Sequence, residues 1–330
     1  MTKKITRKAF LKRAAAIGIG ARITSLPIKL TEARTETKSR VIIAINESVR
    51  DSNGKVVQAI VDRMLGNSIK KLADTNNAED AWRRIFKPTD VVGIKINCLG
   101  GPGIYTSKEV VSAIIKGLRL VNIPEENIII WDRTERDLRK CRYKINRNGS
   151  GVRCYGTLPS VGYEEQPTRM GEFEGRLSKI LTQKITALIN APILKDHNLA
   201  GITGTMKNHY GSFSNPQDYH ANTCDPYIAD LNAIPLIKEK TRLLVYDAIR
   251  PLADGGPVNK AGFRWDYNGL LTGFDPVAVD YQGWRIIEAR RRELGLPSLE
   301  EAGRPPKYLD SAAKRGVGTN DPEKIESIYV

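Results

Sequence analysis

The stretch between residues 91 and 132 most constrains the fold of this chain, because it reads as a strand, a helix and a second strand. "VVGIKIN" is a short apolar run typical of a buried strand, and the glycine-rich turn "CLGGPGIYTS" follows it. Thr106 or Ser107 can cap the next segment, "KEVVSAIIKGLRLV", which is predicted to be a helix, and "NIIIWD" closes the unit as a strand. A connecting helix places two strands parallel, so this segment predicts a parallel sheet.

The same alternation continues along the 330 residues. Helices are predicted at residues 55–73 and after Asp275-Pro276, and strands at "RVIIAIN", "ITALINAPIL", "TRLLVYDAI", "NGLLTG" and in the final "GVGTNDPEKIESIYV". Residues 133–175 break this pattern, since they are rich in Arg, Gly and Pro. We therefore expect one α/β domain over residues 41–330, with a mainly parallel or mixed sheet, helices on both faces, and an irregular insertion or cap at residues 133–175.

The net charge of +15 is concentrated in two segments. Residues 1–40 hold eleven Lys and Arg against two acids, a net +9, and residues 133–153 hold eight against two, a net +6. The rest of the chain is neutral. A nucleic-acid-binding face would spread cations over a groove-sized surface, so this distribution argues against nucleic acid as a partner. No apolar run approaches the eighteen or so residues that span a bilayer, which argues against an integral membrane protein.

The basic leader "TRKAFLKRAAAIGIGARITSLPIKL" has the layout of an export signal. It resembles a twin-arginine signal, with Lys8 in place of the second Arg. Arg22 shortens its apolar region, and Thr31-Glu32-Ala33 offers the small-residue cleavage site. The leader predicts a periplasmic or extracytoplasmic protein; if it is an inactive signal or a retained basic tail, the protein is cytoplasmic.

The four cysteines are scattered along the chain, without a Cys-x-x-Cys pair. An iron–sulfur cluster or a zinc ribbon would need closely spaced thiolates, so neither is expected, and we predict free thiols.

Polar side chains gather where the predicted strands end. In open parallel sheets, ligands bind beyond the carboxyl ends of the strands. These ends are marked by Lys95, Asn97, Asp132, Lys195, His197, Asp247 and Asp275. Both signs of charge are present, which favours an anionic or polar small ligand, with the carboxylates pairing the lysines or holding a cation. The alternative is structural: Asp132 and Asp275 would only cap helices, and Lys95 would pair with one of them.

All three histidines fall in or just after "LKDHNLAGITGTMKNHYGSF" (194–213). If residues 199–210 form a helix, Lys207 and His209 point about 200° apart, since each residue turns the helix by roughly 100°. His209 would then be a packed or capping residue, whereas Lys195 and His197 would precede the helix in a loop. His197, His209 and His220 are also candidate ligands of a divalent metal, although their spacing matches no short metal motif.

Four segments in order, "VVGIKINCLGG", "LINAPILKDHNLAGITGTMKNHYGSF", "LLVYDAIRPLADGGP" and "TGFDPVAVDYQGW", resemble the motifs of the domain-of-unknown-function family numbered 362 over about residues 41–330. The resemblance implies an α/β protein, often with a twin-arginine signal and in some members with ferredoxin-type clusters on additional cysteines. This chain lacks those cysteines. The positions that match the family's polar motifs are Lys95, Asn97, Asp132, Lys195, His197, Thr203, Lys207, Asn208, Asp247, Gly256, Asp275 and Asp280.

Two functions remain open at this point. As an enzyme, the protein would use His197, Lys195 and Asp247 in catalysis, with His197 as general acid/base. The anionic ligand would be bound by Lys95, Asn97, Lys207, Asn208, Thr203, Asp132 and Asp275. The alternative is an exported binding or maturation factor for a redox partner protein, docking through the basic loop 133–153. A catalyst predicts His197 beside a carboxylate in a closed pocket, and a docking factor predicts a broad open surface around that loop.

Overall fold

The computed structural model describes residues 38–330, so the predicted leader lies almost wholly outside the described residues. Thr37–Val330 clusters as one compact unit. Within the described residues, no helix has the length and apolar character that crossing a membrane requires.

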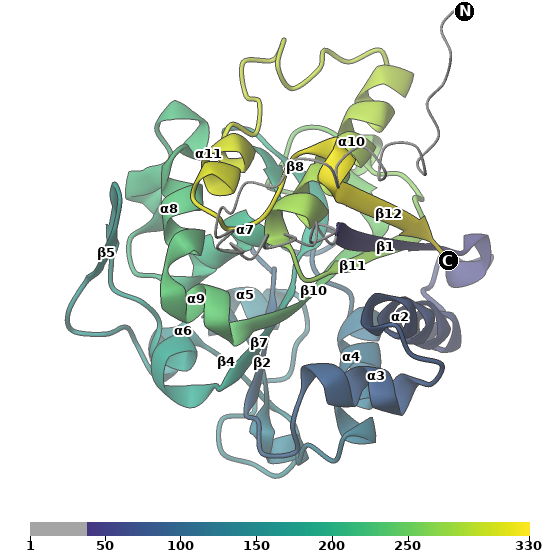
Figure 1. Cartoon of the computed structure of the whole chain (residues 1–330), viewed down its shortest axis with the longest axis vertical. Helices are drawn as coiled ribbons and strands as arrows, with labels where there is room; N and C mark the ends of the chain where they lie inside the picture. The colour runs from purple at the N-terminus through teal and green to yellow at the C-terminus, as the bar shows by residue number, and fades with distance from the viewer. Residues whose placement is uncertain (1–37) are drawn as a thin grey trace, which may run out of the picture. The chain divides into compact units, whose positions relative to one another are not determined.

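A mixed, mainly parallel sheet organises the described chain, as predicted (Figure 1). Its ten strands are β1 (Ser39–Ile45), β2 (Val92–Ile96), β3 (Ile128–Thr134), β4 (Arg153–Gly156), β7 (Ala187–Ala191), β8 (Ile193–His197), β9 (Gly201–Thr203), β10 (Thr241–Leu252), β11 (Gly269–Gly273) and β12 (Ile325–Tyr329). The main order is β12-β1-β11-β10-β7-β2-β3-β4, and β8 extends the pairing from β10 to β9. β11 runs antiparallel to both of its neighbours, and β9 antiparallel to β8, while the other pairs are parallel.

Helices cover both faces of the sheet (Figure 1). They are α2 (Gln58–Ala73), α3 (Ala78–Ile85), α4 (Lys108–Leu120), α5 (Glu135–Lys140), α6 (Thr157–Ser160), α7 (Thr205–Asn208), α8 (Tyr227–Ala233), α9 (Pro235–Lys240), α10 (Pro276–Glu293) and α11 (Tyr308–Lys314). Successive side chains of a strand point to opposite faces of the sheet, so one strand contributes residues to two cores. In β1, Val41 and Ile43 join the core under α8, α10 and α11, whereas Ile42 and Ala44 join the core under α2, α3 and α4.

The insertion predicted at residues 133–175 is less irregular than its composition suggests. It contains β4, which pairs in parallel with β3 and forms the edge of the sheet. It also contains a separate hairpin of β5 (Thr168–Met170) and β6 (Phe173–Gly175). The four residues "RCYG" are too few to show the alternating apolar pattern that predicts a strand. Pairing with β3 stabilises the strand, although the local sequence does not favour it.

Two predictions for residues 185–210 are wrong. "ITALINAPIL" is not one strand, because Pro192 separates β7 from β8. Residues 199–210 are not one helix, because β9 occupies Gly201–Thr203 and α7 spans only Thr205–Asn208 before a 3-10 turn, η4 (His209–Ser212). Lys195 and His197 therefore lie within β8, not in a loop.

Candidate functional site

A cavity of about 250 Å³ opens at the carboxyl ends of β2, β3 and β8. We call it the carboxyl-end cavity. Eight of the ten residues predicted for catalysis or ligand binding line it, together with His220: Lys95, Asn97, Asp132, Lys195, His197, Thr203, Lys207 and Asn208. Five of these, Lys95, Asn97, Asp132, Lys195 and His197, are residues that the strand-end argument named, whereas Thr203, Lys207 and Asn208 come from the family resemblance.

The β8–β9 hairpin supplies three of these side chains. Lys195 and His197 are two residues apart on β8, so they point to the same face, and Thr203 is the cross-strand partner of Lys195. Asp196 points to the opposite face, where it accepts a hydrogen bond from Arg304. Strand alternation therefore separates the cavity-facing lysine and histidine from the buried ion pair behind them.

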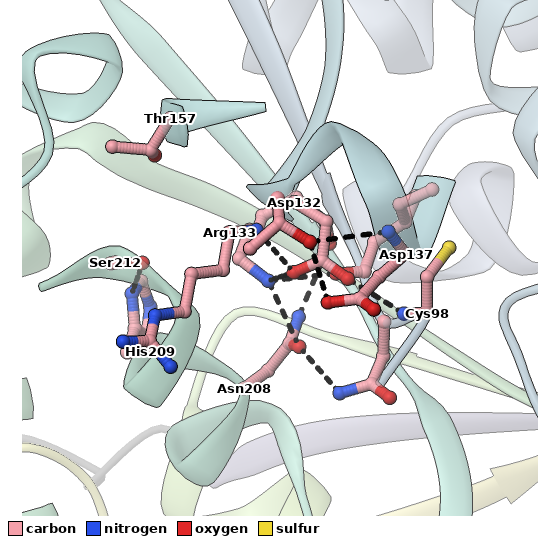
Figure 2. A network of polar contacts seen from close by, with 12 residues as sticks. Cys98, Asp132, Arg133, Asp137, Thr157, Asn208, His209 and Ser212 are labelled. Atoms are coloured by element: carbon pink, nitrogen blue, oxygen red, sulfur yellow. Dashed lines mark hydrogen bonds and ion pairs between the residues drawn. The ribbon is translucent and has the colours of Figure 1, made fainter. Parts of the chain in front are cut away.

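Lys95 lines the cavity and belongs to a network in which its ammonium group has a full set of hydrogen-bond acceptors. Its Nζ donates to Asp132 Oδ1 at 2.7 Å, to the Ile96 carbonyl at 2.7 Å and to Asn208 Oδ1 at 3.3 Å. The other oxygen of Asp132 accepts from the backbone N–H of Cys98 at 2.7 Å. Figure 2 shows the side chains of Asp132 and Asn208 converging in this network. Because its three protons have acceptors and its charge has a partner, Lys95 positions its neighbours.

Lys195 is fully buried but has no carboxylate partner. Its Nζ donates to Asn97 Oδ1 at 2.9 Å and to the Pro257 carbonyl at 3.0 Å, which leaves one proton over. In the described part of the chain, no carboxylate lies within 4 Å of it. Burial lowers the pKa of Lys195 to about 8, although Asp132 acts in the opposite direction.

Lys207 is a second buried lysine in the lining of this cavity. Its Nζ donates to His220 Nε2 at 3.2 Å and lies 3.7 Å from the centre of the Tyr210 ring. Burial lowers the pKa of Lys207 to about 8. Within the described chain, this ammonium thus lies beside a neutral imidazole, an aromatic face and the thiol of Cys224, whose contact raises the pKa of Lys207 against the effect of burial. These groups solvate a cation without neutralising it.

His197 presents a hydrogen-bond donor to the cavity. Its Nδ1 accepts the backbone N–H groups of Leu199 at 3.1 Å and Ala200 at 3.3 Å, so in the neutral ring the proton is on Nε2. Burial, reinforced by Lys207 and the stacked His220, lowers the pKa of His197 well below its ordinary value. The ring is therefore neutral at pH 7. This geometry does not fit the general base that the sequence suggested, because neither ring nitrogen has a free lone pair.

Thr203 contributes a buried polar atom without a partner. Its side chain is buried, and its Oγ1 makes no hydrogen bond in the structure. Such hydroxyls are rare, because an unsatisfied buried donor costs about 1–3 kcal/mol. It faces the same cavity as the two lysines without carboxylate partners.

Asp247 and Asp275, two of the predicted residues, do not lie in this cavity. Asp275 caps α10, because its Oδ1 accepts from Val277 N at 2.9 Å and Ala278 N at 3.0 Å. It follows β11, the antiparallel strand, whose carboxyl end faces the opposite edge of the sheet. Asp247 lies in the middle of the twelve-residue β10 and lines a different cavity, with its oxygens accepting from the backbone N–H groups of Ser107 and Ile249.

The three histidines are not gathered around one point. His197 and His220 stack at the carboxyl-end cavity with ring centres 5.9 Å apart, whereas His209 faces a separate cavity of about 100 Å³. Burial, with Lys95, lowers the pKa of His209 to about 3. Among residues 38–330, no group of three or more His, Cys, Asp or Glu side chains is arranged to hold a metal ion.

Sequence reasoning missed Arg133 and the role of Tyr210 in the cavity wall. Arg133 directly follows Asp132 at the end of β3, so the strand-end argument could have included it. No sequence pattern predicts the contact between the Tyr210 ring and Lys207, because it depends on how η4 places Tyr210 next to α7.

These observations define an α/β protein with a mainly parallel sheet and a lysine- and histidine-lined cavity at the strand ends. The chain belongs to the family described as Domain of unknown function (DUF362), whose sequence profile matches residues 92–285, more than half of the chain. The match contains every residue placed in the carboxyl-end cavity. No curated protein matches the chain.

The solved structures that are similar to this chain include the following two. One is a protein from Thermotoga maritima, with 11% identity and a TM-score of 0.40 over 73% of this chain and 60% of that chain. The other is the lactate racemase apoprotein from Thermoanaerobacterium thermosaccharolyticum, with 12% identity and a TM-score of 0.43 over 77% of this chain and 58% of that chain. The chain therefore spans less than two thirds of the length of either protein.

Proposed function

We propose that the protein is an enzyme that binds a small oxyanion, such as a carboxylate, in the carboxyl-end cavity and moves a proton on it. The observation that carries this proposal is the pair of buried ammonium groups, Lys195 and Lys207, which have no carboxylate partner among residues 38–330. A buried charge without a counterion is costly, and an anionic ligand would supply the missing counterion. The orphan hydroxyl of Thr203 and the Nε2–H of His197 add two donors on the same walls.

Lys207 is the acid/base in this proposal, and His197 is a neutral donor. A pKa of about 8 allows an amine to take up and release a proton near neutral pH. Its neighbour His220 is half-buried, with Nδ1 3.4 Å from the Gln217 carbonyl, so it can relay that proton towards solvent. Lys195 and His197 then hold the anionic group.

Binding is tested by calorimetric titration with acetate, pyruvate, oxalate and inorganic phosphate. Lys195→Met and Lys207→Met should each weaken the best anion at least about tenfold, since an ion pair of this kind contributes at least roughly 1.4 kcal/mol. Lys71→Met, at an exposed lysine next to the end of α2, is the matched control and should bind like the wild type. Equal binding by all four proteins would refute the anion site.

Catalysis is tested separately in D2O. Proton spectra of 2-oxo and 2-hydroxy acids should lose their C–H signal next to the carboxylate with wild-type protein and not with Lys207→Met. Binding without exchange for any acid in the series would contradict the acid/base role and leave a binding protein.

The second candidate function is a docking factor for a redox partner, and the surface of residues 133–153 favours it. Six basic side chains there are exposed: Arg136, Arg139, Lys140, Arg142, Lys144 and Arg147. Arg139 and Arg147 pair with Glu135, and Arg136 with Asp137, which leaves three cations for an acidic partner. Export by the leader and the redox partner both stay predictions.

A further inference from the structure

A second cavity, of about 240 Å³, lies where β10 passes the start of α4. We call it the arginine cavity, because Arg50, Arg250 and Arg264 all line it. The glycine-rich turn after β2 runs between the two cavities: Asn97 and Leu99 line the carboxyl-end cavity, and Gly103 and Tyr105 line the arginine cavity.

The three guanidinium groups share a single ion-paired carboxylate. Asp266 pairs with Arg50, and its Oδ1 lies 3.4 Å from Arg250 Nε, without the geometry of a hydrogen bond. Arg264 has no carboxylate within 4 Å in the part of the chain that the structure describes, and it donates Nε and Nη2 to the carbonyl of Arg250. Asp266 is itself half exposed, which weakens both of its pairs.

The two other carboxylates of this cavity form no ion pair with the arginines, although Asp247 is close enough to Arg264 to offset part of its charge. Both oxygens of Asp247 are occupied by backbone N–H groups, at 2.8 Å from Ser107 and 3.1 Å from Ile249. Glu109, in the first turn of α4, forms no ion pair with any of the three arginines. Burial and the neighbouring Arg250 lower the pKa of Arg264 to about 10, and the opposing effects of Asp247 and Asp266 do not restore it, as expected where cations outnumber carboxylates.

We propose that the arginine cavity binds the phosphate group of a small phosphorylated molecule. Planar guanidinium groups bind tetrahedral oxyanions through paired hydrogen bonds, and a dianion would neutralise two of the three arginines. The cavity lining also includes Val56, Tyr105 and Ile193, which would contact the organic part of the ligand. This site is independent of the function proposed for the carboxyl-end cavity.

The test is a calorimetric titration of the full chain with glycerol 3-phosphate and with inorganic phosphate. Arg264→Gln and Arg250→Gln should each weaken glycerol 3-phosphate at least about tenfold, while Lys207→Met should leave its affinity unchanged. Arg264→Lys retains the charge but loses the paired geometry, so it should also bind more weakly than the wild type.

Each outcome decides the proposal. Wild-type affinity in a folded Arg250→Gln or Arg264→Gln would overturn it, and so would loss of glycerol 3-phosphate binding in Lys207→Met, which would place the phosphate in the carboxyl-end cavity. In Lys207→Met, whose carboxyl-end cavity is impaired, tighter binding of inorganic phosphate than of glycerol 3-phosphate would contradict the phosphorylated molecule, because the apolar lining would then contribute nothing. If Arg264→Gln fails to fold, Arg250→Gln decides alone, since the carbonyl of Arg250, not its side chain, holds Arg264.

Discussion

At the scale of single residues, the carboxyl-end cavity is distinguished by side chains that the fold leaves incompletely satisfied. Lys95 and Asp132 would be stable together without any ligand, since each has its full set of partners. Lys195, Lys207 and Thr203 are not satisfied in this way, and they occupy the same cavity. Buried hydroxyls without a partner also occur outside the cavity, at Thr272 and Tyr308, so the gathering of both lysines and Thr203 in one cavity is what marks this site as functional.

Thr203→Val tests this at one atom. Valine has the same shape, so the substitution removes only the hydroxyl, and the ligand-free protein should keep its stability or gain up to about 1 kcal/mol. Anion affinity should fall. The matched control is Thr106→Val, where the hydroxyl donates to the Ala191 carbonyl at 2.7 Å and accepts from Asn97 N at 3.0 Å, so that variant should lose stability. Thermal unfolding with and without anion measures both, and a Thr203→Val protein as unstable as Thr106→Val would contradict the orphan hydroxyl.

The two lysines predict how binding and stability depend on pH. Only an ammonium binds the anion, so affinity should fall about tenfold from pH 7 to pH 9 for each lysine that is required. Stability should move the other way. In the folded state both pKa values are lowered from 10.5 to about 8, so between pH 8 and 10.5 the unfolded chain holds more protons and the free energy of unfolding rises with pH. That contribution is lost as the pH falls through 8.

Unfolding of the wild type and of the double variant Lys195→Met/Lys207→Met across this range measures the effect as a difference. The variant should be the more stable protein at pH 7, with the gap closing towards pH 10. A gap independent of pH would show that the lysines are not buried as charges.

The identity of the cavity residues could largely be predicted from the sequence, but their roles could not. Lys195 and His197 were found because polar residues end an apolar run. The tautomer of His197 depends on a turn of three residues that folds its own N–H groups onto Nδ1, and the prediction of a helix from residue 199 hid that turn. Asp275 was misplaced because a sequence does not state that β11 runs antiparallel.

At the scale of elements, a long-range contact fixes where α7 begins and so where Lys207 lies. Asp280, buried in α10, accepts from Thr205 N and Thr205 Oγ1 with one oxygen, and from Met206 N at 3.1 Å with the other. These bonds join residues 74 and 75 positions apart, so no local pattern could announce them. The apolar residues at helical spacing therefore led to a wrong prediction of a helix over residues 199–210. The pairing of β9 and the cap from Asp280 outweigh the local helical pattern.

Asp280→Asn should lower the free energy of unfolding by about 1–3 kcal/mol, because the amide group places a donor against a backbone N–H. It should also weaken anion binding, since Lys207 and Asn208 follow directly in α7. Asp275→Asn is the control: it damages a cap of the same kind on α10, outside the cavity, and should cost stability without changing affinity. The anion affinity of both variants is measured by calorimetric titration. If Asp280→Asn bound the anion as tightly as Asp275→Asn, the cap on α7 would not position the site.

At the scale of the whole molecule, one sheet packs against two cores and positions the site at the carboxyl ends of its strands. Alternate residues of β1 pack into opposite cores, so neither core can persist once the sheet is lost. Most cavity side chains come from β2, β3, β8, β9 and α7, and the connections after β3, β8 and β9 are short. Their relative positions are therefore fixed by the pairing of the sheet more than by the loops.

This arrangement predicts that residues 38–330 unfold in a single transition. Fluorescence, with one buried tryptophan reporting from each core, Trp82 and Trp131, should give the same midpoint as far-ultraviolet circular dichroism. A saturating anion should raise both midpoints together, because binding to any part of a cooperative unit stabilises all of it. At a hundred times its Kd, the anion should add about 2.7 kcal/mol to the free energy of unfolding. Trp82→Phe removes the reporter of one core and should leave the remaining transition in place. Two separated midpoints, with the anion raising only one, would instead show that the site belongs to a core that folds independently of the other.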